Sequence, residues 1–258
     1  MPRVRADSLN PPATGCGPRH ISVVCVTYRG GLVDFSSLAD GRFALLVIDM
    51  ENDFVEAGAP LEFPEGRGIM ANLQRVLAVA RDGGVPVIYA AHVHRVDGTD
   101  LGPHRDLYPP VAAGQALVDG SRGVEIYSEI APRANEPVIK KHRYNSFFAT
   151  DLEMVLRGHG VDTVVLTGMT TECCVLGTAR GALERGFRSV VLSDATASCD
   201  YPDLGHGPMS AAEMHLAALR IMSLTSSAVA TVDEFVAQLS RSGVPLGHAE
   251  ICLTARDR

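Results

Sequence analysis

Hydrophobic and polar residues follow one another along the chain in a repeating order of short apolar runs and longer helical patterns. Short runs rich in apolar residues, typical of buried parallel strands, lie at residues 43–48, 85–91, 137–140, 162–167, 188–193 and 227–231. Between them, apolar residues recur at helical spacing in residues 69–81, 150–158, 171–185, 209–222 and 231–239. Strands that alternate with helices predict an α/β fold in which a mainly parallel sheet has helices on both faces.

Local capping signals refine the helix boundaries. A Thr followed three residues later by Glu can form a capping box, and Thr150 with Glu153 and Thr231 with Glu234 fit that pattern. We therefore expect one helix to open with the box at Thr150 and the last helix to open with the box at Thr231.

The pattern also indicates how the chain is divided. Residues 1–40 contain Pro11-Pro12 and several glycines, and we expect an N-terminal arm that is partly disordered or lies on the body. Residues 41–258 carry the regular alternation without an internal repeat, which predicts a single domain. The connection at 92–136 is long, and such segments usually build a site wall or an interface.

Composition narrows the classes of partner. The 258 residues are 46% hydrophobic and 21% charged, which is ordinary for a soluble globular protein. A net charge of −7 argues against nucleic acid or an anionic membrane as the main partner, and no apolar run has the length of a membrane span. Six cysteines without paired spacing do not resemble a disulfide scaffold or a zinc motif. We therefore expect a cytoplasmic protein.

The strand predicted at 162–167 runs into a turn and a helix that carry the first candidate for chemistry. The strand breaks at Gly168, and the helical pattern that follows places Cys174 near a helix start. A helix N-terminus offers unpaired N–H groups and a partial positive charge, which lower the pKa of a thiol held there. Cys173 and Cys174 could also both be small core residues, but this setting favours one of them as a nucleophile.

Two other strand ends carry reactive side chains. Asp49 closes the first strand, and Lys140 and Lys141 close the third. Taken singly, Asp49 could be a turn residue and either lysine a solvated surface charge. Because active sites in such sheets lie at the carboxyl ends of the strands, we expect a carboxylate, an ammonium and a thiol to meet there. Amide hydrolysis through a thioester requires these three groups.

Three motifs around these residues resemble a known family. The residues VIDMENDF at 47–54, KHRYNSFF at 141–148 and GMTTECCV at 168–175 occur in the order found in the isochorismatase-like cysteine hydrolases. That family includes nicotinamidases, N-carbamoylsarcosine amidases, biuret hydrolases, ureidoacrylate hydrolases and isochorismatases. The resemblance implies a three-layer α-β-α fold with a six-stranded, mainly parallel sheet of order 3-2-1-4-5-6.

The same resemblance implies a role for each motif residue. Asp49 becomes the general base, Lys141 the cationic partner and Cys174 the nucleophile. A cis peptide is expected at Met169-Thr170, with the backbone N–H groups of Thr170 and Cys174 forming an oxyanion hole. Lys140 and Cys173 are then neighbours without a chemical role.

The predicted sheet order places a constraint on Lys141. The third strand lies two strands from the first, about 10 Å away at ~4.8 Å per strand. We therefore expect Lys141 to lie on a loop that bends over the sheet, and not on the strand itself.

These observations favour a cysteine-dependent amidohydrolase that acts on a small carboxamide or ureido (N-carbamoyl) substrate. Two alternatives remain on the same fold: an isochorismatase-type vinyl-ether hydrolase, which does not need the thiol, and a binding protein without catalytic activity. The expected substrate-binding residues are His94, Tyr108, Arg143 and Glu172, the last of which stands where many family members have Asn.

Three histidines raise the question of a metal. His92 and His94 follow the second strand, and His104 is nearby. In nicotinamidases this region reads Asp-x-His with a later His and binds a divalent metal, whereas here His92 takes the Asp place and the later spacing differs. We therefore expect hydrogen-bonding pocket histidines, with no metal and no other cofactor.

The long connection predicts an assembly. It contains apolar residues that a monomer would leave as an exposed patch, namely Leu107, Tyr108, Val111, Leu117, Val118 and Ile126. Relatives in the family are commonly dimers or tetramers. We therefore expect a homodimer or homotetramer in which this segment or the N-terminal arm contacts a neighbouring subunit.

Overall fold

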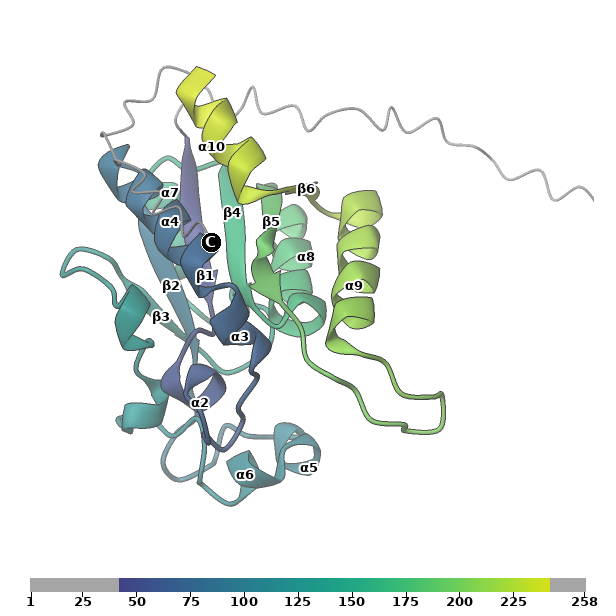
Figure 1. Ribbon diagram of the computed structural model, residues 1–258. Coiled ribbons are helices and arrows are strands. Elements are labelled where there is room, and N and C mark those ends of the chain that lie inside the picture. The colour runs from purple at the N-terminus through teal and green to yellow at the C-terminus, as the bar shows by residue number, and fades with distance from the viewer. Residues whose placement is uncertain (1–41, 242–258) are drawn as a thin grey trace, which may run out of the picture. The chain divides into compact units, whose positions relative to one another are not determined.

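The computed structural model describes residues 42–241 and contains one six-stranded sheet. The N-terminal arm expected over residues 1–40 lies outside the described residues. All strand pairs are parallel, and the order β3-β2-β1-β4-β5-β6 confirms the predicted one (Figure 1). The strands are β1 (Phe43–Ile48), β2 (Val87–His92), β3 (Val138–Lys141), β4 (Thr163–Met169), β5 (Arg188–Ala197) and β6 (Ala228–Ala230).

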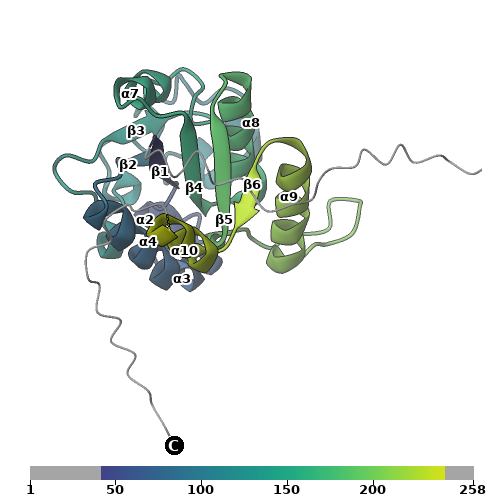
Figure 2. The same cartoon turned by 90° about the horizontal axis from the view of Figure 1, so that it is seen from above.

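Helices cover both faces of this sheet (Figure 2). One face carries α4 (Met70–Asp82) and α10 (Val232–Arg241). The other carries α7 (Leu152–Gly158), α8 (Leu176–Glu184) and α9 (Ala211–Thr225). Shorter elements complete the fold: α2 (Asn52–Val55), α3 (Glu65–Gly68), α5 (His104–Leu107), α6 (Pro109–Ala112), the 3₁₀ turns η1 (Arg122–Val124) and η2 (Ser128–Ile130), and the π-helical turn η3 (Thr171–Val175).

Strand β1 shows why the two layers of helices form. Its alternate side chains Phe43, Leu45 and Val47 belong to the core under α4 and α10, while Ala44, Leu46 and Ile48 belong to the core under α7 and α8. Every residue of β1 is buried. A strand covered on both faces can be apolar throughout, which is the pattern the sequence displays.

Hydrogen bonds at the helix starts confirm one predicted capping box and contradict the other. Before α10, the Glu234 carboxylate accepts the Thr231 N–H, and the Thr231 hydroxyl accepts the Glu234 N–H. The box at Thr150 was wrong, because α7 begins only at Leu152. The Thr150 hydroxyl donates to the Ser146 carbonyl at 2.6 Å and so serves the preceding turn.

Gly168 fixes the way in which β4 ends against β1. Its φ of 97° lies in the left-handed region, and a Cβ at this position would lie 2.0 Å from the Ile48 carbonyl oxygen. Only glycine combines this backbone conformation with so close an approach. The consequence is that β4 can turn into η3 directly beside the end of β1.

The connection at residues 92–136 lies beyond the carboxyl ends of the strands, where α5 and α6 are seen below the sheet (Figure 1). The expectation that its apolar residues form an exposed patch was wrong for Val111, Leu117 and Ile126, which are buried in the core of the same chain, whereas Leu107 is 59% exposed. The buried Asp53 carboxylate holds the segment in place by accepting the Leu117 N–H at 2.7 Å. Within residues 42–241, no helix is both long and apolar enough to cross a membrane.

Candidate active site

Asp49, Lys141 and Cys174 meet at the carboxyl edge of the sheet. Asp49 follows β1, Lys141 ends β3 and Cys174 lies in η3. The Lys141 Nζ is 2.8 Å from Asp49 Oδ2 and 3.3 Å from Cys174 Sγ. All three residues are almost completely removed from solvent, with exposed fractions of 2% for Asp49, 0% for Lys141 and 6% for Cys174.

The position of Lys141 corrects the expectation that it lies on a loop over the sheet. It is the last residue of β3 and pairs with His92 on β2. The long methylene stem carries the ammonium across β2 to Asp49, so that no loop is needed. A third contact, from Nζ to the Arg143 carbonyl at 3.2 Å, holds the ammonium in place. The neighbouring Lys140 points away and pairs with Asp119 at 2.6 Å.

The backbone at Asp49 turns sharply as β1 ends. Its φ is 51°, in the left-handed region, where Asp is among the few non-glycine residues found with any frequency. The Asp49 N–H still donates to the Ala90 carbonyl at 2.8 Å, which anchors this residue to β2. The carboxylate therefore stands on a rigid strand end and not on a loose loop.

Burial dominates the proton affinities of these three side chains. It raises the pKa of Asp49, and the charge of Lys141 offsets this only in part. Burial alone would lower the pKa of Lys141, but the charge of Asp49 and that of the Cys174 sulfur together hold it above the ordinary value. The pKa of Cys174 lies well above its usual range because of burial and the adjacent Asp49 charge.

The expectation of a lowered thiol pKa was therefore wrong. The start of a helix favours a thiolate, but here the thiol is buried beside a carboxylate whose negative charge disfavours a second one. Burial and the adjacent Asp49 charge therefore both favour a neutral Cys174 thiol, which lies beside the contact between Lys141 and Asp49.

The turn before Cys174 contains the cis peptide that the resemblance implies. The Met169-Thr170 peptide is cis. The Thr170 carbonyl accepts N–H groups from Cys173 at 3.3 Å and from Val175 at 3.1 Å, which places Cys174 between two anchored residues. Such π-helical turns occur frequently at functional sites.

A cavity of about 370 Å³ opens above Asp49 and Cys174. Of the expected substrate-binding residues, His94, Tyr108 and Glu172 line it. The Arg143 side chain is not among the lining residues, and its guanidinium donates to the His142 carbonyl. The apolar part of the lining consists of Phe54, Leu61, Phe63, Leu107, Val111, Leu117, Met169, Pro202 and Leu204.

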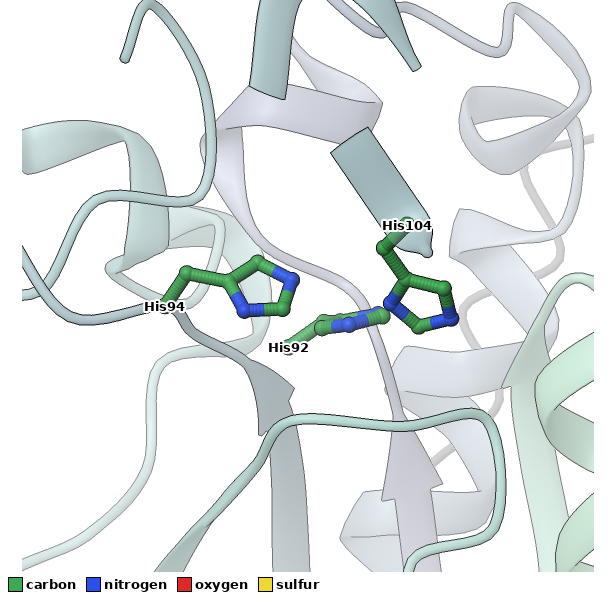
Figure 3. A group of neighbouring side chains, drawn as sticks. All are labelled: His92, His94 and His104. Atoms are coloured by element: carbon green, nitrogen blue, oxygen red, sulfur yellow. The ribbon is translucent and has the colours of Figure 1, made fainter. Parts of the chain in front are cut away.

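Three histidines form one side of the cavity (Figure 3). The ring centroids of His92 and His94 are 5.0 Å apart, and that of His104 is 5.6 Å from His92 and 5.8 Å from His94. Burial is the main reason why all three have lowered pKa values, with that of His104 at about 4. The buried Nε2 of His92 and Nδ1 of His104 have no hydrogen-bond partner among the described residues. Such a donor set fits a divalent metal ion.

Comparison with known proteins decides the family. The sequence model of the Isochorismatase domain family matches residues 43–245. The chain belongs to the isochorismatase family.

Individual relatives within the isochorismatase family cover different shares of the chain. N-carbamoylsarcosine amidase of Arthrobacter sp is 34% identical over 151 residues, which are 58% of this chain and only 57% of the amidase. Ureidoacrylate amidohydrolase RutB of Pseudomonas syringae pv. syringae (strain B728a) is 30% identical over 222 residues, which are 80% of this chain and 86% of that protein. The crystal structure of a cysteine hydrolase from Pseudomonas syringae pv. phaseolicola 1448A has a TM-score of 0.76 and 35% identity, and the match covers 78% of this chain and 94% of that one.

This member of the isochorismatase family builds one cavity wall from residues that carry no motif. Cys199, Asp200, Tyr201, Pro202 and Leu204 come from the connection between β5 and α9. There the Glu172 carboxylate accepts hydroxyl hydrogen bonds from Ser198 and, at 3.0 Å, from Tyr201. No sequence pattern predicts this wall, because an irregular connection has no periodicity that shows which of its side chains face the cavity.

Proposed function

We propose that the protein is a cysteine-dependent amidohydrolase that cleaves a small carboxamide or ureido substrate through a thioester. The observation that carries the proposal is the position of Cys174 Sγ, 3.3 Å from Lys141 Nζ at the base of a cavity that Asp49 also lines. A thiol, a base and a cation in contact are the parts that nucleophilic acyl transfer needs. That the protein hydrolyses C–N bonds rests on its family and on relatives that are amidases and amidohydrolases.

The first half-reaction forms the acyl-enzyme. Asp49 accepts the proton of Cys174 as the sulfur attacks the carbonyl carbon of the substrate. Lys141 remains protonated and stabilises the developing negative charge on sulfur. The backbone N–H groups of Thr170 and Cys174 hold the oxyanion of the tetrahedral intermediate.

The second half-reaction releases the products. Protonated Asp49 gives its proton to the departing ammonia or amine, and the C–N bond breaks to leave the thioester. Asp49 then takes a proton from a water molecule that attacks the thioester. Collapse of this second intermediate returns the proton to the Cys174 sulfur and releases the acid.

The proposal includes a small-molecule substrate and a cytoplasmic location. The described cysteines, Cys173, Cys174 and Cys199, are free thiols, as a reducing compartment requires.

The test is a Cys174→Ala variant assayed for ammonia release from nicotinamide, biuret, N-carbamoylsarcosine, ureidoacrylate and maleamate. The native protein should turn over at least one of these amides and accumulate an acyl adduct on Cys174, detected by mass spectrometry. The variant should lose both signals while unfolding in the same temperature range. Amide hydrolysis by pure Cys174→Ala protein would refute the mechanism, and retained vinyl-ether cleavage would favour the isochorismatase alternative.

A further inference from the structure

We infer that Glu172 sets the charge preference of the cavity: it favours amides whose remote end donates hydrogen bonds or carries a positive charge, and it excludes amides that end in a carboxylate. The inference rests on the proposed amidohydrolase function and names its class of substrate. Glu172 lies in η3, two residues before Cys174, and both residues line the cavity. Because two residues of chain span at most about 7 Å, a substrate of a few carbon atoms can reach both side chains.

Hydrogen bonds on both sides hold the turn that carries Glu172. The Thr171 hydroxyl is 2.8 Å from His215 Nδ1 on α9. The Val175 N–H donates to the Thr170 carbonyl at 3.1 Å and closes the turn on its other side. The backbone at Glu172 is therefore anchored, and the carboxylate keeps a defined place relative to the nucleophile.

Two hydroxyl groups orient the Glu172 carboxylate. Ser198 donates to its Oε2, and Tyr201 donates to its Oε1 at 3.0 Å. Ser198 is buried, and the Tyr201 backbone exchanges two hydrogen bonds with Met209, so neither donor is a loose surface group. A carboxylate offers about four acceptor positions, of which these hydroxyls use two. Both donors are neutral and leave the negative charge in place, with acceptor positions free for a substrate.

The rest of the cavity supplies no basic side chain to offset this charge. None of the described lining residues is Lys or Arg, and most of the other lining side chains are apolar or aromatic. Asp200 adds a second carboxylate, which is exposed at the rim. A substrate carboxylate near Glu172 therefore meets like charge without a partner, whereas an ammonium or an N–H group meets a free acceptor.

This charge preference divides the amides that test the proposed function. N-carbamoylsarcosine, ureidoacrylate and maleamate each carry a carboxylate, and nicotinamide and biuret do not. Biuret also ends in N–H donors. We therefore expect biuret to be turned over with a higher kcat/KM than any of the three compounds that carry a carboxylate.

The decisive test compares three amides of similar length: succinamide, 4-aminobutanamide and succinamate. Their remote ends are a neutral donor, a cation and an anion. A carboxylate within about 4 Å of Glu172 should lower kcat/KM at least about tenfold relative to the neutral and cationic amides. Glu172→Gln keeps the length of the side chain and an oxygen acceptor, and it should reduce that ratio toward one.

Two further variants serve as controls. Asp200→Asn removes the carboxylate at the rim but keeps the oxygen that accepts the Ala211 N–H, and it should change the ratio less than Glu172→Gln does. Glu184→Gln removes an exposed charge at the end of α8, away from the described lining residues, and should leave all three values unchanged. The ratio is taken within each protein, so a general loss of activity in a variant cancels, as does any charge on the three-histidine wall.

The outcomes separate the role of Glu172 from the proposed function. A native preference for succinamate, or an unchanged ratio in Glu172→Gln, overturns the role of Glu172 and leaves the amidohydrolase function standing. If Glu172→Gln does not fold, Glu172→Asn takes its place, because many family members have Asn at this position.

If no amide is hydrolysed, the proposed function fails, and binding of the same three amides decides the charge preference. Calorimetry on the native protein should then show weaker binding of succinamate than of the other two, and Glu172→Gln should remove the difference. Equal binding of all three amides, or no binding of any, would overturn the inference.

Discussion

At the scale of single residues, the protonation of Asp49 should control the pH dependence of the reaction. Asp49 must be ionised to accept a proton, and burial has raised its pKa above the usual value of 3.8. As pH falls through that raised pKa, kcat/KM should fall, and it should do so at a higher pH than an exposed Asp would dictate. Because the Cys174 pKa is also raised, the rate should not climb steeply near the ordinary pKa of a thiol.

The measurement is kcat/KM from about pH 5 to pH 9 under conditions where the protein stays folded. The apparent values will belong to the coupled triad and not to one residue. An acid limb near the pKa of an exposed Asp, or rapid alkylation of Cys174 by iodoacetamide well below pH 8, would contradict the neutral-thiol resting state.

The ion pair between Lys141 and Asp49 makes a second prediction about single residues. Lys141→Met leaves a buried carboxylate without its cation and should destabilise the protein by roughly 3–5 kcal/mol. Asp49→Asn combined with Lys141→Met removes both charges and should recover part of that loss. Urea unfolding of the two single variants and the double variant gives the coupling energy, and strict additivity would show that the pair does not act as a unit.

The sequence predicts where the site residues lie along the chain, but it does not predict how deeply they are buried or which distant residues they contact. Asp49, Lys141 and Cys174 could be found because they follow strands, and parallel strand ends share one edge. The raised pKa of Cys174 could not be predicted from the sequence, since it depends on how completely neighbouring segments exclude water from the thiol. The separation of His104 from His92 along the chain likewise does not predict that their rings lie close together, because it is the tertiary structure that brings α5 next to the end of β2.

At the scale of elements, Gly168 lies where β4 leads into the turn before Cys174, and its replacement should affect both stability and the proposed activity. Gly168→Ala adds the strain of a left-handed φ and drives a Cβ against the Ile48 carbonyl. The matched control is Gly186→Ala, where φ is 77° but a Cβ meets nothing within 4 Å. The control should cost about 1–2 kcal/mol of unfolding free energy.

Gly168→Ala should cost clearly more than the control and should lower kcat, because separating β1 from β4 moves Asp49 relative to Cys174. Thermal unfolding and ammonia release measure the two effects. Equal losses of stability in the two variants would mean that the close approach at Gly168 relaxes without consequence.

Element boundaries show which local signals are reliable. The box at Thr231 opens α10 as predicted, but Thr150 does not open α7, since its hydroxyl is used by Ser146. β5 extends to Ala197, beyond the predicted end at residue 193, because its last residues pair with β4 after a register shift. Apolar periodicity identified the six strands and the five longer helices but none of the short helices α2, α3, α5 and α6, while side-chain competition and sheet pairing set the ends of the elements.

At the scale of the whole molecule, the structure indicates α9, and not the 92–136 connection, as the interface of the predicted homo-oligomer. The connection buries Val111, Leu117 and Ile126, three of the six apolar residues on which the prediction rested, within its own chain. Helix α9 instead buries only Ala218, Leu219 and Met222, and it leaves Leu216, Ile221 and Leu224 exposed at 46%, 42% and 57%. Apolar residues gathered on one exposed helix are typical of an interface.

We therefore expect light scattering to give a multiple of 27.4 kDa at micromolar concentration. Leu216→Glu combined with Leu224→Glu should shift the mass toward the monomer without changing the unfolding temperature of the subunit, because these side chains support no core of their own. The control Val96→Glu places the same charge in the 92–136 connection, where Val96 is 79% exposed, and should leave the assembly intact. A native monomer with full activity would refute the assembly, and dissociation by Val96→Glu alone would return the interface to the connection.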